Sequence, residues 1–178
     1  MKNIKLIVGL SNPYKEYKKT RHNVGSWFIR ILSRKVSVDL KIKNKFFGYI
    51  GLWKKCKNDI YLLIPNLYMN LNGISISIVS SFYKIKSDDI LIIQDDLNTD
   101  IGKYNFINSH NSYGHNGIKN VKSKFEKNTL FKRICIGIGK PDKNVNLSSY
   151  VLSIPTETDK NLIIQSIEKS MHIIEKFL

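Results

Sequence analysis

The sequence contains few cysteines and no long apolar run, and both shortages restrict what the protein can be. Its two cysteines, Cys56 and Cys135, form neither a C-x-x-C motif nor a disulfide framework, so we expect a reducing, cytoplasmic environment. Nothing approaches eighteen consecutive apolar residues, which argues against a membrane span. The opening MKNIKLIVGL passes straight into a turn, so we expect a first strand there and not a signal peptide.

Several standard sites are also missing. The sequence has no G-x-S-x-G nucleophile elbow, no Walker phosphate loop, no G-x-G-x-x-G and no H-E-x-x-H. The GIGK run at 137–140 is followed by Pro141, which cannot supply the hydroxyl of a phosphate loop. His110 and His115 are five residues apart without supporting cysteine or carboxylate spacing. We therefore do not expect these histidines to form a metal site.

Acidic residues are scarce relative to basic ones. The 29 Lys and Arg against 14 Asp and Glu give a net charge of +15, which favours a polyanionic partner, nucleic acid first. An alternative is compositional bias, because Ile and Asn are abundant as well, as an AT-rich genome would produce. The lysines are dispersed along the chain, so no disordered basic arm is predicted. Both interpretations of the charge remain open at this point.

The length fits one domain spanning residues 1–178. Segment 71–85 is ambiguous, because its isoleucines alternate as in a strand but also fit one helix face, and we interpret it as a helix. Alternating strands and helices predict an α/β domain with a twisted, mostly parallel or mixed sheet flanked by helices on both faces. The other expected strands are 5–8, 45–53, 60–65, 89–94, 102–107 and 131–138. The other expected helices are 25–37, 117–125 and one that follows a capping box at 156–159.

Polar residues that could perform chemistry follow the predicted strands. His22 precedes a predicted helix, and Asp95 ends a buried strand, where ligands of α/β sheets bind. A carboxylate can orient an imidazole, and such a histidine without a Ser or Cys nucleophile in view is suited to activating water. The neutral amides of Asn12, Asn70 and Asn116 could hold a peptide-like group. Each residue also has an ordinary structural explanation, as a surface histidine, a helix cap or a turn asparagine.

A series of short motifs extends along the chain up to about residue 155. They are KLIVGLSNP (5–13), TRHNVG (20–25), KFFG (45–48), PNLYMNLNG (65–73), DDL (95–97), GHNG (114–117) and IGIGKP (136–141). In their order and spacing these motifs resemble the bacterial peptidyl-tRNA hydrolase family.

This resemblance implies an esterase that cleaves the bond between a peptide and the 3′-terminal ribose of tRNA, releasing tRNA for reuse in translation, without metal or cofactor. By match, His22 is the base that activates water, and Asp95 orients it. The expected substrate-binding residues are Asn12, Tyr17, Met69, Asn70, His115 and Asn116. We expect a monomer with peptidyl-tRNA as its partner and no membrane association.

The sequence departs from the family at Tyr14, where glycine is usual, and in the loop 108–113, which is glycine-rich in relatives. Basic positions expected to contact tRNA are replaced by Asn105, Ile107 and Cys135. We expect nearby cations to compensate, namely Lys103, Lys119, Lys122, Lys132 and Arg133. Two rival readings stay open: a catalytically silent RNA-binding protein on the same fold, and a small esterase with no nucleic acid partner.

Overall fold

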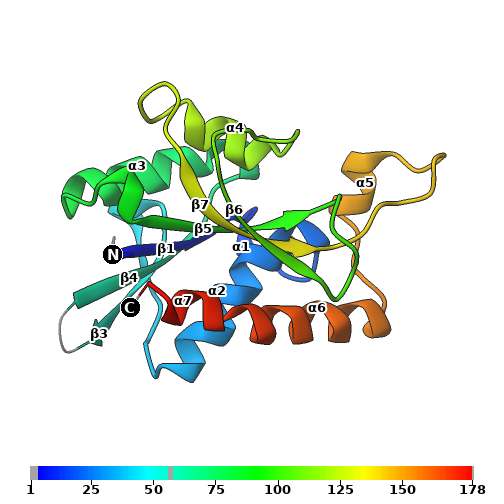
Figure 1. The fold of residues 1–178 in the computed structure, drawn as a ribbon, viewed down its shortest axis with the longest axis horizontal. Coiled ribbons are helices and arrows are strands. Elements are labelled where there is room, and N and C mark those ends of the chain that lie inside the picture. The colour runs from blue at the N-terminus through cyan, green and yellow to red at the C-terminus, as the bar shows by residue number, and fades with distance from the viewer. Residues whose placement is uncertain (1–3, 56–57, 178) are drawn as a thin grey trace.

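Seven strands form one mixed sheet in the order β2-β3-β4-β1-β5-β7-β6 (Figure 1). The structure, a computed structural model, describes residues 4–55 and 58–177. The strands are β1 Leu6–Gly9, β2 Lys41–Lys43, β3 Gly48–Lys55, β4 Asn58–Pro65, β5 Ile90–Asp96, β6 Tyr104–Ser109 and β7 Phe131–Gly137. The centre of the sheet, β4-β1-β5-β7, is parallel, and β2, β3 and β6 are antiparallel to their neighbours. The predicted mixed sheet is thereby confirmed.

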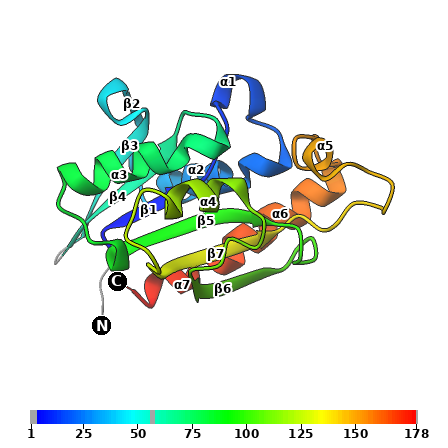
Figure 2. The same ribbon diagram turned by 90° about the horizontal axis from the view of Figure 1, so that it is seen from above.

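Helices cover both faces of the sheet, as predicted (Figure 2). The apolar stripes of α2 (Val24–Lys35) and α6 (Glu157–Ser170) join one buried cluster, while those of α3 (Asn72–Phe82) and α4 (Asn116–Lys122) join another. Two short α-helices, α1 (Tyr14–Tyr17) and α5 (Leu147–Val151), lie in loops, and α7 (His172–Glu175) follows α6. The 3₁₀ turns are η1 Arg21–Asn23, η2 Asn44–Phe46, η3 Met69–Leu71 and η4 Ser87–Asp89. No helix among the described residues is long and apolar enough to cross a membrane.

The predicted elements differ from the observed ones mainly at their ends. Thr156 is the N-cap of α6, as predicted, because the Asp159 N–H donates to Thr156 Oγ1 at 3.1 Å. The reciprocal bond of a capping box is not formed between these two described residues, since the Asp159 carboxylate instead accepts from Arg21. The ambiguous segment is a helix over 72–82, with Ile76 and Val79 buried three residues apart. The strand expected from residue 45 begins only at Gly48, since η2 and a left-handed Phe47 precede it. The predicted hairpin turn includes residues 56–57, which lie outside the described residues.

A close backbone contact places the start of α2 at the carboxyl end of β1. A Cβ atom added to Gly9 would lie 2.0 Å from the carbonyl oxygen of Gly25, and one added to Gly25 would lie 2.6 Å from the amide of Leu10. Only glycines allow helix and strand to approach so closely. The turn η1 immediately precedes α2, so this contact fixes His22 at the edge where the parallel strands end.

Candidate active site

Asp95 is the centre of a buried polar group at the carboxyl end of β5. His22, on η1, lies with Nδ1 2.9 Å from each carboxylate oxygen of Asp95. The Asp95 side chain is buried, and that of His22 is nearly so. The structure therefore brings together two residues that are 73 positions apart in the chain and were predicted to meet.

His115 contacts the same carboxylate. Its Nε2 lies 3.1 Å from Asp95 Oδ1, and the His22 and His115 ring centres are 5.0 Å apart. His115 is the N-cap of α4: its Nδ1 accepts the backbone N–H groups of Gly117 and Ile118, at 3.1 and 3.4 Å. Because Nδ1 accepts, the neutral ring carries its proton on Nε2 and donates it to Asp95. His115 is thus held in one tautomer by the helix that it caps.

The shared carboxylate determines the protonation of His22. Burial alone lowers the pKa of His22, but the charge of Asp95 and its hydrogen bond outweigh that effect, so the pKa lies above its ordinary value of 6.5. Burial raises the pKa of Asp95, but the two imidazoles outweigh it and hold that pKa well below its ordinary range. Asp95 is therefore ionised and accepts the Nδ1–H of His22. The lone pair on Nε2 of His22 is then free to accept a proton.

The same three side chains also have the composition of a metal site. The nitrogens of His22 and His115 and a carboxylate oxygen of Asp95 all lie within 4.8 Å of one another. However, the nitrogen–oxygen distances of 2.9 and 3.1 Å are hydrogen-bond lengths. Two ligands bound tetrahedrally at the usual zinc distances would lie roughly 3.3 Å apart. The geometry fits a hydrogen-bonded triad better than a zinc site, and the expected metal-free reaction stays a prediction.

Asn12, just beyond β1, is held by two neighbours. Its backbone N–H donates to Asn23 Oδ1 at 2.9 Å, and Asn23 Nδ2 donates back to the Asn12 carbonyl at 3.1 Å. Its side-chain oxygen accepts the backbone N–H of Met69 at 2.8 Å. Within residues 4–55 and 58–177, the Asn12 Nδ2 has no protein acceptor. This amide nitrogen is consequently available as a hydrogen-bond donor.

The remaining predicted amides flank the triad on two elements that touch. Asn70 lies on η3 and Asn116 begins α4, and both side chains are exposed. The two elements are in contact, since a Cβ atom added to Gly117 would lie 2.7 Å from Met69 Sδ. Tyr17 instead packs edge-to-face against Tyr68, with ring centres 6.4 Å apart. An imidazole hydrogen-bonded to a carboxylate and several amides therefore lie at one edge of the sheet, a set of groups suited to hydrolysing a carbonyl compound.

Known proteins share this sequence and fold. The family model described as peptidyl-tRNA hydrolase matches residues 6–178. The peptidyl-tRNA hydrolase of Buchnera aphidicola subsp. Cinara cedri is 43% identical over 180 residues, covering 100% of this chain and 93% of that protein. The chain belongs to the peptidyl-tRNA hydrolase family. The counterpart from Photorhabdus laumondii subsp. laumondii is 42% identical over 172 residues, covering 96% of this chain and 87% of that protein. The crystal structure of peptidyl-tRNA hydrolase from Acinetobacter baumannii has a TM-score of 0.91 at 36% identity, covering 98% of this chain and 88% of that one.

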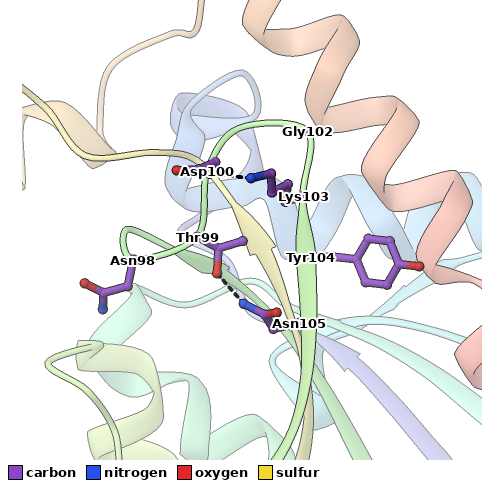
Figure 3. Close-up of a pocket in the computed structure, with 7 residues that line it drawn as sticks. All are labelled: Asn98, Thr99, Asp100, Gly102, Lys103, Tyr104 and Asn105. Carbon is purple, nitrogen blue, oxygen red and sulfur yellow. Dashed lines mark hydrogen bonds and ion pairs between the residues drawn. The ribbon is translucent and has the colours of Figure 1, made fainter.

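As a member of the peptidyl-tRNA hydrolase family, this chain is a hydrolase. Three of the lysines that were predicted to bind tRNA lie in two places. Lys119 is exposed and Lys122 partly exposed on α4, the helix capped by His115. Lys103 lines an open pocket of about 420 Å³ between the end of β5 and the start of β6 (Figure 3). The Lys103 ammonium lies 2.7 Å from Asp100 Oδ2, and both side chains are highly exposed, so water screens the pair. Asn105 donates to Thr99 Oγ1 in the same pocket.

Arg133 was predicted to contact tRNA, but its side chain is fully buried. One guanidinium nitrogen donates to Gln94 Oε1 at 3.2 Å and another to the Asn111 carbonyl at 2.5 Å. Tyr113 lies over the guanidinium, 5.8 Å from ring centre to carbon. In this conformation Arg133 ties the loop before His115 to the strand that carries Asp95, and it does not reach the surface. We therefore leave it out of the proposed tRNA contacts.

Sequence reasoning missed the residues that hold the site in place. Asn72 binds the backbone of Ser11 in the way that Asn23 binds the backbone of Asn12. Its side chain accepts the Ser11 N–H at 2.9 Å and donates to the Ser11 carbonyl at 2.8 Å. Arg21 binds Ser153 Oγ at 2.7 Å and Asp159 Oδ2 at 3.0 Å. Asn23, Asn72 and Arg21 all lie inside the motifs that carried the family resemblance. The signal that identifies these residues is that their polar side chains are buried.

Proposed function

We propose that this hydrolase cleaves the ester between the peptide carboxyl and the 3′-terminal ribose of peptidyl-tRNA, with His22 as the base that activates water. The observation that supports this role is the hydrogen-bonded series His22–Asp95–His115, in which His115 is locked by its helix and Asp95 is ionised. In this arrangement His22 Nε2 removes a proton from water as the water oxygen attacks the ester carbonyl. The resulting imidazolium is stabilised by Asp95 and returns the proton to the leaving ribose oxygen.

Water is the reasonable nucleophile because nearby side-chain alternatives are poorly suited. Burial raises the pKa of the Cys135 thiol to about 12, so this thiol stays protonated at neutral pH. The buried Ser11 hydroxyl donates to the Pro65 carbonyl at 2.7 Å. An ester of ribose is reactive enough that a base and a positioned water suffice, with the base contributing about 10²- to 10⁴-fold.

The amides supply recognition of the peptide in this proposal. Asn12 Nδ2, Asn70 and Asn116 bind the peptide backbone and the oxygen that becomes negative during attack. Such groups discriminate strongly against an aminoacyl-tRNA, because a free α-amine cannot replace a peptide N–H and C=O. Lys119 and Lys122 on α4 hold tRNA phosphates beside the triad. A monomeric, cytoplasmic, metal-free enzyme remains our prediction.

Peptide release from N-acetyl-aminoacyl-tRNA tests the proposal. His22→Ala should lower the rate by about 10³-fold or more and leave tRNA affinity nearly unchanged. His110→Ala is the matched control, because His110 is exposed and absent from the triad. A His22→Ala enzyme with wild-type rate would disprove the role of the base. A wild-type protein that binds tRNA without releasing peptide is the silent binder, and release from simple acyl esters without preference for tRNA indicates a small esterase.

A further inference from the structure

Phe47 occupies a position that costs stability without an evident structural return. Its backbone is left-handed, with φ 50°, and its side chain is 47% exposed. Residues other than Gly, Asn and Asp are disfavoured in this region. The conformation is fixed from both sides: the Phe47 N–H donates to the Asn44 carbonyl at 3.0 Å, and the Phe47 carbonyl accepts from the Asn66 N–H at 2.8 Å. A large, exposed aromatic held in a strained conformation points to a function.

The position of Phe47 connects it to the active site. Asn66 begins the segment 66–70, which delivers Met69 and Asn70 to the triad, and Asn66 Oδ1 accepts the Tyr14 N–H at 3.1 Å. The backbone of Phe47 is therefore joined to the same segment that positions Asn12 through Met69. In Figure 2 the turn that follows β2 and the helix α1 project in the same direction from the sheet.

Other apolar side chains are exposed along this segment. Tyr68 is 52% exposed and Leu71 38%, on either side of buried Met69 and exposed Asn70. These two residues and Phe47 are here called the apolar strip. The strip adjoins the amides that we propose hold the peptide backbone, while the cations Lys119 and Lys122 lie on α4.

We propose that the apolar strip binds side chains of the peptide upstream of the ester, with Phe47 as a specificity-determining residue for apolar sequences. This inference rests on the proposed function, because it requires a peptidyl ester in the site. We take the peptide to leave the reacting centre as an extended chain. The strip offers it exposed apolar side chains on the residues that flank Met69 and Asn70, and on Phe47, whose backbone is hydrogen-bonded to the same segment. The side chains of an extended peptide alternate in direction, so only some of them meet Phe47.

The left-handed backbone permits a clean test. Phe47→Gly and Phe47→Asn remove the ring and fit φ 50°, so neither should lower the melting temperature. We expect kcat/KM for tRNA carrying a leucine-rich pentapeptide to fall about fivefold to tenfold, the value of burying roughly half a phenylalanine ring. Values for N-acetyl-aminoacyl-tRNA and for a serine-rich pentapeptide should change less than twofold. Phe106→Ser, on the opposite edge strand β6, is the control for removing an exposed phenylalanine.

Four results would overturn the subsite. An equal loss on long and short substrates would make Phe47 a general determinant of the site, and a lower melting temperature in both variants would make it structural. An equally large loss of affinity for deacylated tRNA would show that the ring contacts RNA. A wild-type enzyme inactive on all three substrates would instead refute the proposed function, and the subsite with it.

Discussion

Replacing Asp95 by asparagine changes one atom of the triad and should reverse the tautomer of His22. The carboxylate accepts two N–H groups, from His22 Nδ1 and His115 Nε2, whereas an asparagine offers one accepting oxygen and one donating NH₂. His115 cannot adapt, because its Nδ1 already accepts the N–H groups of Gly117 and Ile118. The amide oxygen must therefore face His115 and the NH₂ must face His22. His22 then carries its proton on Nε2, where the lone pair is needed.

The size and the pH dependence of the effect follow from the same contacts. The corresponding change in a serine protease triad costs about 10⁴ in kcat, and a general base contributes about 10²- to 10⁴-fold. We expect kcat/KM at pH 7.5 to fall about 10³-fold, or about 4 kcal/mol of transition-state stabilisation. Activity requires neutral His22, so the wild-type rate should rise with pH through a pKa above 6.5, raised by Asp95 against the effect of burial. In the variant His22 is still buried but has lost the negative charge of Asp95, so its pKa should be lowered and the rate should rise below pH 6.5.

The assay is peptide release from N-acetyl-aminoacyl-tRNA between pH 5.5 and 8.5, corrected for spontaneous hydrolysis of the ester. The loss in the variant should be smallest at acid pH and should grow as pH rises through the wild-type pKa. Asp96→Asn is the matched control, since the neighbouring carboxylate accepts from Thr99 Oγ1 and the Asn98 N–H and contacts no triad residue. If the rate of the variant rose at the same pH as that of wild type, or if kcat/KM fell less than tenfold, Asp95 would not be the partner of His22.

Two further predictions concern α4. His115→Asn keeps an N-cap but loses the N–H that donates to Asp95. We therefore expect an unchanged melting temperature, a rate lowered about tenfold and a pH–rate profile that rises at higher pH. His115→Ala should in addition lose about 1 kcal/mol of stability, measured by denaturant unfolding. A rate as high as that of wild type in His115→Asn would contradict a positioning role. Lys119→Ala and Lys122→Ala should each weaken tRNA binding and reduce the slope of log affinity against log salt by about 1, with kcat unchanged. An unchanged slope would remove these lysines from the tRNA interface.

The sequence predicted the elements whose side chains decide their structure locally. β1 and β5 are apolar because both faces are covered, and the Thr156 cap marks where α6 begins. β2 was not predicted, because all three of its residues are exposed and only pairing with β3 makes it a strand. The beginning of β3 was misplaced because Phe47 takes a left-handed conformation that its residue type does not signal.

The sequence allowed us to predict the side chains of the candidate site that have chemical roles. It did not allow us to predict those that hold distant parts of the backbone in place. His22 and Asp95 could be singled out from their residue types, the first just before a predicted helix and the second at the end of a buried strand. Asn72 acts on the backbone of Ser11, 61 residues away, which no local pattern reveals. Arg133 could have been placed better from its strand alone, since a period of two puts it on the same face as buried Phe131 and Cys135.

The position of His22 depends on its two neighbours more than on its own turn. A three-residue 3₁₀ turn has few internal hydrogen bonds and would not by itself hold a ring at a fixed distance from Asp95. Arg21 anchors one side, to Ser153 and to Asp159 in the first turn of α6, while Asn23 anchors the other side to the Asn12 backbone. His22, the proposed base, and Asn12, a proposed peptide-binding amide, are thereby fixed to each other through Asn23. The same base is fixed to the C-terminal helix through Arg21, so changes in α6 can reach the active site without touching substrate.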